Sequence, residues 1–206
     1  MYYYSVGHKA TKEIVIRKSR FIGFISPVMD EVEAENLLII AKERWPQARH
    51  YCYAYILHEQ KIERYSDDGE PSGTAGVPIL SVLRNNSLEN VMLIVTRYFG
   101  GTLLGAPGLV RAYSQTASLV IQATRIKKLE LCIQLRVKCD YTYWDNIEHK
   151  LLQKGVLIEH IDYLEKVIAH IYCPVEKEEY FKDQIISFSN GSAEIITYSR
   201  EYKSLS

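Results

Sequence analysis

The distribution of apolar and polar positions predicts several strands in the first part of the chain. Residues 13–27 and 51–57 are rich in β-branched and aromatic side chains, which is typical of strands, and residues 61–65 are expected to pair with 51–57 as a hairpin. Residues 91–99 begin with a nearly continuous apolar run, as a buried strand does. We therefore expect a β-sheet in this part of the chain.

Periodic apolar positions predict three helices around these strands. The first follows Asp30, which begins a capping box with Glu33, and it ends at Pro46. The second is expected to start with Thr74 as its cap and to run to about residue 86. The third is expected at 109–125, where one side of the pattern is apolar.

The last part of the chain has an order of its own. Its patterns read strand, helix, strand, strand, helix, strand within about 75 residues, which is the ferredoxin-like order. The sequence therefore predicts an α+β fold with two domains, residues 1–130 and residues 131–206, although no proline- or glycine-rich linker marks the boundary.

Composition narrows the class of protein without naming a function. The 206 residues carry 25 basic and 25 acidic side chains, so the strong positive excess of many nucleic-acid binders is absent. The balance is uneven, because residues 1–130 carry a net charge of +3 and residues 131–206 a net charge of −3. Four cysteines without metal-binding spacing are expected to be reduced thiols of a cytoplasmic protein, with no secretory signal, membrane span or cofactor.

A glycine-rich loop at residues 100–108 connects the predicted buried strand to the third helix. Free backbone N–H groups at such a helix start can bind an anion, and Arg97 and Arg111 could grip a phosphate or carboxylate in the same pocket. The loop matches neither of the common phosphate-binding motifs. The plainer interpretation is a tight turn whose arginines pair with nearby acids.

An acidic loop precedes the second helix and contains Asp67, Asp68 and Glu70. These carboxylates could hold Mg²⁺ or act as acid and base. They could instead bond their own turn and pair with the arginines of the other loop. We favour this second interpretation, in which the acids hold the arginine loop in place and glycines allow the two loops to pack into one rigid recognition surface.

Weaker candidates lie nearby. His50 precedes a strand and could lie near the loops, although a structural histidine is the commoner case. The basic cluster of Arg17, Lys18 and Arg20 within the first predicted strand could contact phosphates or form an exposed strand face. No nucleophile with a base at motif spacing is present.

Four segments together resemble the Impact family, which includes the bacterial YigZ-type members. They are SDDGEPSGTAGVPIL (66–80), VTRYFGGTLLGAPGLVRAY (95–113), ARHYCYAY (48–55) and RKSRFIGF (17–24). The resemblance covers about residues 10–125, and Pro107 stands where the family more often has glycine. It implies a first domain like the second domain of ribosomal protein S5, with helices on one face of a twisted sheet. The second domain resembles a ferredoxin-like module of elongation factor G.

Function also follows from the resemblance. Eukaryotic Impact proteins regulate translation initiation, so we expect a non-enzymatic binding or regulatory protein that recognises RNA, the ribosome or a protein partner. The alternatives are a small phosphorylated-ligand binder or hydrolytic enzyme that uses Asp67, Asp68, Glu70 and the 100–108 loop, and a purely structural role of both loops. The motif positions expected to bind are His50, Asp67, Asp68, Gly69, Glu70, Pro71, Gly73, Thr74, Gly76, Arg97, Tyr98, Gly100, Gly101, Gly105, Gly108, Arg111 and Tyr113.

Overall fold

A computed structural model describes residues 1–205 of the chain. Contacts between Cα atoms divide it into two compact units. The first is Tyr3–Lys127, and the second joins Met1–Tyr2 to the residues from Lys128 onward. No helix within residues 1–205 is long and apolar enough to cross a membrane.

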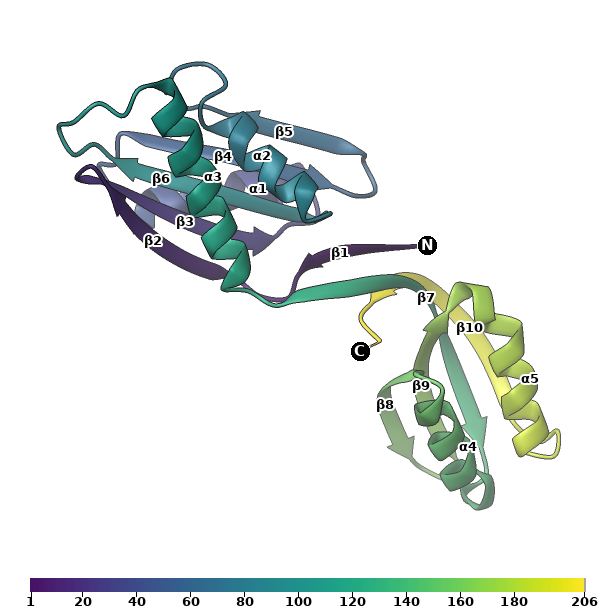
Figure 1. The fold of residues 1–206 in the computed structure, drawn as a ribbon. Helices are drawn as coiled ribbons and strands as arrows, with labels where there is room; N and C mark the ends of the chain where they lie inside the picture. The colour runs from purple at the N-terminus through teal and green to yellow at the C-terminus, as the bar shows by residue number, and fades with distance from the viewer. Residues whose placement is uncertain (206) are drawn as a thin grey trace. The chain divides into compact units, whose positions relative to one another are not determined.

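The first unit is built on a five-stranded antiparallel sheet in the order β2-β3-β6-β4-β5 (Figure 1). Its strands are β2 (Ala10–Ile16), β3 (Ser19–Pro27), β4 (His50–Leu57), β5 (Ile62–Ser66) and β6 (Val91–Tyr98), preceded by β1 (Tyr2–Val6). The strand segment expected at 13–27 belongs to a hairpin of β2 and β3. Arg17 and Lys18, with φ of 46° and 65°, form its turn, so this part of the basic cluster lies at a tip and not within a strand.

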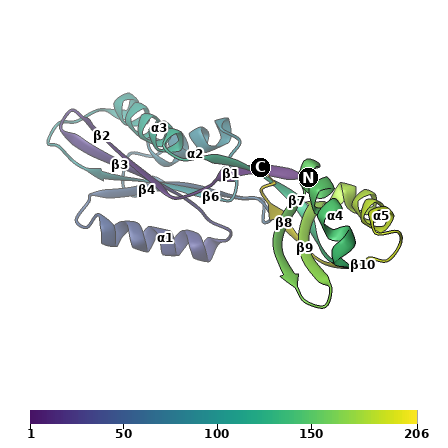
Figure 2. The ribbon, with the colours of Figure 1, turned by 90° about the horizontal axis from the view of Figure 1, so that it is seen from below.

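Helices cover both faces of this sheet. They are α1 (Glu31–Arg44), α2 (Gly76–Asn85) and α3 (Ala106–Gln122), and Figure 2 shows α1 on one side of the sheet and the other two opposite. The expectation of helices on one face only was therefore wrong. Along β6, Leu93 and Val95 belong to the core under α2 and α3, whereas Met92 and Ile94 belong to the core under α1. The uninterrupted apolar run at the start of this strand fills both cores.

The starts of the helices follow capping chemistry. Asp30 accepts a hydrogen bond from the backbone N–H of Glu33, and the Glu33 side chain accepts one from the backbone N–H of Met29, which confirms the predicted start of α1. Helix α3 begins at Ala106, earlier than the predicted residue 109. Pro107 lies in its first turn, where the fixed φ of proline suits a helix and the missing N–H is harmless.

The second unit has the predicted order of elements. They are β7 (Ile126–Cys139), α4 (Tyr141–Gln153), β8 (Leu157–Tyr163), β9 (Val167–Pro174), α5 (Glu178–Phe188) and β10 (Glu194–Lys203), with a short 3₁₀ turn at Val175–Lys177. The strands pair antiparallel in the order β10-β7-β9-β8. Trp144 and Ile147 of α4 and Phe181 and Ile185 of α5 form the core with alternate residues of the strands. Both units together give the α+β fold that the patterns predict.

Candidate functional site

Asp67 of the acidic loop caps helix α2 from a distance. Its Oδ1 accepts hydrogen bonds from the backbone N–H groups of Ala75 (3.0 Å) and Gly76 (2.8 Å), and its Oδ2 accepts one from Gly73 (2.8 Å). The prediction that Thr74 caps this helix was wrong, because its hydroxyl donates to the carbonyl oxygen of Pro71 at 2.6 Å. A carboxylate binds several N–H groups at a helix start more strongly than a hydroxyl does, and Asp67 occupies that place.

Asp68 holds the same loop against strand β4. Its Oδ2 accepts a hydrogen bond from the backbone N–H of Tyr51 at 2.6 Å. Its carbonyl oxygen lies 2.6 Å from Nδ1 of His50, so Nδ1 carries the proton and donates it. In the neutral imidazole, Nε2 is then left as an acceptor. The sequence left open whether His50 lies near the loops, and the structure brings it into direct contact with the acidic loop.

Glu70 is a buried carboxylate with a cationic partner. Its side chain is only 3% exposed, and its Oε1 accepts hydrogen bonds from Nη1 of Arg97 (2.5 Å) and from the Tyr113 hydroxyl (2.8 Å). Nε2 of His50 lies 3.9 Å from the same oxygen. The predicted pairing between an acid of the first loop and an arginine at the second is therefore realised by Glu70 and Arg97.

The side chain of Arg97 is buried and makes its contacts inside the first unit. Its side chain is 6% exposed, its Nη2 donates to Ser19 Oγ at 3.3 Å, and its guanidinium carbon lies 5.3 Å from the Phe21 ring centre and 5.5 Å from that of Phe99. Arg111 is exposed on α3 and lines no part of the pocket described below. The two arginines therefore do not face one pocket, because Arg97 lines it and is paired with Glu70, whereas Arg111 lies outside its lining.

Burial also keeps two groups beside Glu70 protonated, the Tyr113 hydroxyl and the Cys52 thiol. It raises the pKa of the Tyr113 hydroxyl and that of the Cys52 thiol far above their usual ranges, with neighbouring Cys52 adding to the effect on Tyr113. The thiol donates to the carbonyl oxygen of Asp67 at 3.0 Å. Both groups therefore act as hydrogen-bond donors, and Cys52 is a structural thiol and not a nucleophile.

The three acids of the loop consequently have three separate sets of partners. Asp67 binds backbone amides of α2, Asp68 binds β4, and Glu70 binds Arg97 and Tyr113. Among residues 1–205, no three His, Cys, Asp or Glu side chains are grouped so that they could hold a metal ion. The arrangement fits the interpretation in which the acids organise the loops.

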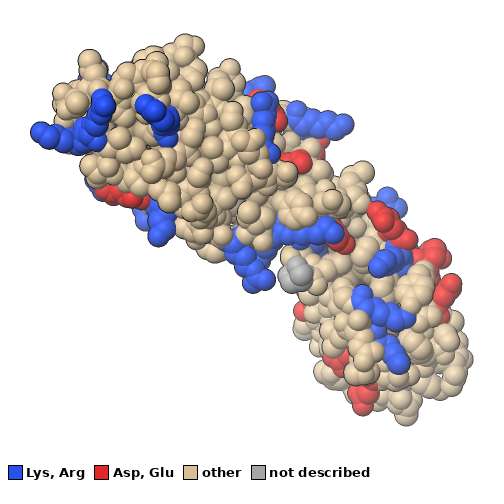
Figure 3. All heavy atoms as spheres, in the orientation of Figure 1, with Lys and Arg blue, Asp and Glu red and all other residues tan. Residues whose placement is uncertain are grey.

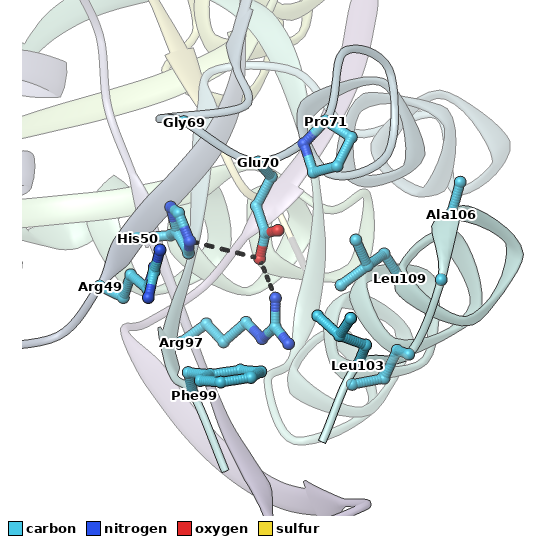
Figure 4. Close-up of a pocket in the computed structure, with 12 residues that line it drawn as sticks. Arg49, His50, Gly69, Glu70, Pro71, Arg97, Phe99, Leu103, Ala106 and Leu109 are labelled. Carbon is cyan, nitrogen blue, oxygen red and sulfur yellow. Dashed lines mark hydrogen bonds and ion pairs between the residues drawn. The ribbon is translucent and has the colours of Figure 1, made fainter. Parts of the chain in front are cut away.

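The two loops enclose a pocket of about 380 Å³ (Figure 4). Glu70, His50 and Arg97 form its polar side, and Arg49 lies at the edge. The opposite wall is apolar, with Leu103 and Leu109 facing the polar group in Figure 4. The remaining lining residues are Gly69, Pro71, Phe99, Leu104, Gly105 and Ala106.

Glycine is required where backbone segments meet around this pocket. A Cβ atom on Gly100 would come 2.0 Å from the carbonyl carbon of Lys18, so only glycine lets the second loop touch the β2–β3 turn. A Cβ atom on Gly76 would come 2.9 Å from the backbone of Ser66. Gly101 lies in the loop outside the pocket lining, and Gly108, predicted to be in the loop, lies in the first turns of α3.

Several lining residues were not among the predicted binding positions. Phe99, Leu103 and Leu104 lie within the quoted motif, and Leu103 is 80% exposed while Phe99 is 40% exposed. The sequence signal that would have identified them is the presence of large apolar side chains within and next to a glycine-rich loop. Tyr98, which was predicted to bind, donates its hydroxyl to the Pro46 carbonyl oxygen and is not part of the pocket lining.

Exposed basic residues surround this end of the first unit. Arg17, Lys18, Arg49 and Arg111 are all exposed, and Figure 3 shows Lys and Arg side chains where Figure 1 places the β2–β3 turn. The Arg49 guanidinium carbon lies 5.8 Å from the Phe99 ring centre, so it covers part of the apolar edge of the pocket. Arg20 is instead paired with Glu13 at 2.6 Å.

Residues 17–121 match the model of the Impact N-terminal domain, which is half of the chain, and residues 137–192 match a domain of unknown function (DUF1949). The chain belongs to the Impact family. It is 38% identical over 195 residues to the IMPACT family member YvyE of Bacillus subtilis, an alignment that covers 94% of this chain and 89% of YvyE.

Two further matches extend over most of this Impact-family chain. The IMPACT family member YigZ of Escherichia coli is 32% identical over 185 residues, which cover 88% of this chain and 90% of YigZ. A crystal structure described as that of a hypothetical protein is 28% identical, with a TM-score of 0.63 over 97% of this chain and 98% of its own. The Impact-family assignment therefore holds for both units.

Proposed function

We propose that this Impact-family protein is a non-enzymatic binding protein of the translation machinery that contacts RNA through the first unit. The observation that carries the proposal is the distribution of charge around the pocket. Inside, Glu70 and Arg97 neutralise each other. Outside, Arg17, Lys18 and Arg49 are exposed, and unpaired cations on a surface are the groups that bind phosphates.

The family supplies the biological setting of the proposal. Eukaryotic Impact proteins regulate translation initiation, and residues 17–121, which match the Impact N-terminal domain, include the whole pocket lining. A binding role also agrees with the chemistry of the site. The Cys52 thiol and the Tyr113 hydroxyl stay protonated, and Asp67 is occupied by three backbone N–H groups.

A second candidate is a binding protein for a small phosphorylated ligand. The observation that favours it is the pocket itself, because 380 Å³ falls within the range of about 300–1,000 Å³ typical of small-molecule sites. In that case Arg49, the exposed arginine at the edge of the pocket, would bind the phosphate. Use of Asp67, Asp68 and Glu70 as a hydrolytic group has less support, because each already has its own partners.

Co-sedimentation with ribosomes across a salt series tests the proposed function. The informative variant combines Lys18→Gln with Arg49→Gln, which removes two exposed charges and leaves the buried ion pair intact. We expect wild-type binding to weaken with salt, and the variant to bind roughly tenfold more weakly with a shallower salt dependence.

The matched control combines Lys150→Gln with Lys177→Gln in the second unit, which changes the net charge equally. Equal weakening by both pairs would show that only total charge matters. Binding that neither pair changes, or no binding at low salt, would refute an RNA contact at this surface.

A further inference from the structure

One oxygen of the buried Glu70 has no partner among residues 1–205. Oε1 accepts from Arg97 and Tyr113, whereas Oε2 makes no hydrogen bond with any described residue. In Figure 4 this second oxygen points away from Arg97 and His50, toward the side where Leu109 lies. Glu70 lines the pocket, and this oxygen is not one of the fully buried unpartnered atoms, so it is open to a donor that enters the pocket.

His50 places a second acceptor beside it. Because Nδ1 donates to the Asp68 carbonyl oxygen, Nε2 of the neutral ring has a lone pair, and it lies 3.9 Å from Glu70 Oε1. The polar side of the pocket thus offers two neighbouring acceptors. A ligand that fits here presents hydrogen-bond donors.

The charge balance decides which kind of donor fits. The carboxylate of Glu70 is already compensated by Arg97, and the remaining fixed charge of the pocket lining is Arg49 at the edge. An ammonium or guanidinium ligand would find no net negative charge. A neutral group that carries an N–H₂ donor, attached to an anion, satisfies both the acceptors and Arg49.

The apolar walls favour a flat ring. Leu103 and Leu109 lie across from the acceptors and Phe99 lies next to Arg97, and π-faces pack well against such side chains. A nucleotide whose base carries an exocyclic amino group combines these three features: an edge with hydrogen-bond donors, a flat ring and an attached anion.

We propose that this pocket binds a single amino-bearing nucleobase, with its amino group donating to Glu70 Oε2 and its phosphate at Arg49. The inference rests on the proposed function, since a base splayed out of single-stranded RNA is one source of this chemistry. A free nucleotide is the other source. Uracil, which has no amino group, is expected to bind poorly.

The test changes the ligand and leaves the fold of the protein untouched. Fluorescence anisotropy of the full chain is measured with a short uridine-rich RNA that carries one central adenosine, and with the same RNA carrying purine riboside, which lacks the amino group. We expect the purine riboside RNA to bind about tenfold more weakly, since loss of a base-edge hydrogen-bond pair costs about that factor.

Two protein variants test whether the base preference comes from the pocket, one that fills it and one that adds bulk outside it. Ala106→Phe places a ring at a lining position that is exposed, and it removes no polar group. Val110→Phe adds similar bulk to an exposed position of the same helix outside the pocket lining. The preference for adenosine should disappear in the first variant and persist in the second.

The outcomes separate the inference from the proposed function. RNA binding that is equally tight with both bases, or a preference that Ala106→Phe leaves intact, overturns the nucleobase pocket and leaves the RNA contact standing. If neither RNA binds, but AMP binds directly and purine riboside monophosphate does not, the pocket chemistry is supported with free nucleotide as its source and the RNA contact is overturned. No binding of either form overturns both.

Discussion

The two sheets of this protein differ in how they are covered. In the first unit every residue from Val91 to Arg97 in the central strand is buried, because helices lie on both faces. In the second unit β9 alternates, with Ala169 and Ile171 in the core and Ile168 and His170 half-buried on the face away from it. A sheet covered on both faces has an interior deep enough to hold charged groups.

The ion pairs of the two units reflect this difference. Glu70 and Arg97 are 3% and 6% exposed, whereas Glu194 and Lys138 in the second unit are 64% and 34% exposed. Water screens the exposed pair and solvates either partner if the other is lost. Removing one partner of the buried pair leaves a charge without compensation. A pair of opposite charges therefore has a structural role in one unit and a minor role in the other.

The largest expected effect comes from breaking the buried pair. Arg97→Ala should lower the free energy of unfolding of the first unit by about 3–5 kcal/mol, because Glu70 stays buried without its cation. Urea titration with thiol labelling and mass spectrometry measures each unit separately. The first unit contains Cys52, the second contains the other three free cysteines, and all four are buried in the native protein.

Lys138→Ala is the matched control and should lower stability by no more than about 1 kcal/mol. In the Arg97 variant the first adduct to appear should be that of the single thiol of the first unit. Equal effects of the two substitutions would mean that the buried pair is not a special support of the loops.

A smaller effect is expected from the two aspartates that begin helices. Asp67→Ala removes three hydrogen bonds to backbone N–H groups and should destabilise the first unit by about 2–3 kcal/mol. Asp30→Ala removes one bond at an exposed helix start and should cost about 1 kcal/mol.

The same urea titration compares these two variants. Asp67 also joins the acidic loop to α2, so its loss should reduce RNA binding at the pocket as well, while Asp30→Ala should leave binding unchanged. A variant at Asp30 as damaging as that at Asp67 would contradict the long-range cap.

The smallest effect concerns acid stability of the second unit. The hydrogen bond from Lys182 holds the pKa of Glu178 below its ordinary value of 4.5. A lowered folded-state pKa adds stability that is complete above the ordinary value and is lost as the pH falls through the lowered one. Lys182→Ala should therefore make the second unit unfold at a slightly higher pH in an acid titration.

In a Trp45→Phe background, the fluorescence of Trp144, which is buried in the second unit, follows that titration. Lys177→Ala removes the same charge at an exposed neighbouring position and serves as the control. Identical acid midpoints for the wild type and the Lys182 variant would show that the contact with Glu178 has no effect on stability.

Local sequence patterns predicted most of the helices and strands, because the formation of these elements depends mainly on residues close together in the chain. The capping box at Asp30, the apolar run of β6 and the strand and helix order of the second unit all follow from spacing along the chain. The errors arose where a distant residue replaced a local one. Asp67, and not Thr74, accepts the hydrogen bonds at the start of α2. Helix α1 covers the second face of the sheet, which was expected to carry no helix.

The amino-acid sequence by itself determined the family, the elements and the two loops that carry the chemistry, since motif residues and periodicity are properties of the chain alone. The tertiary structure decided what each charge does. Arg97 and Arg111 look equivalent in the sequence, yet one is buried against Glu70 and the other faces water. Burial depends on which segments meet in space, and for a charged group burial sets both its partner and its availability to a ligand.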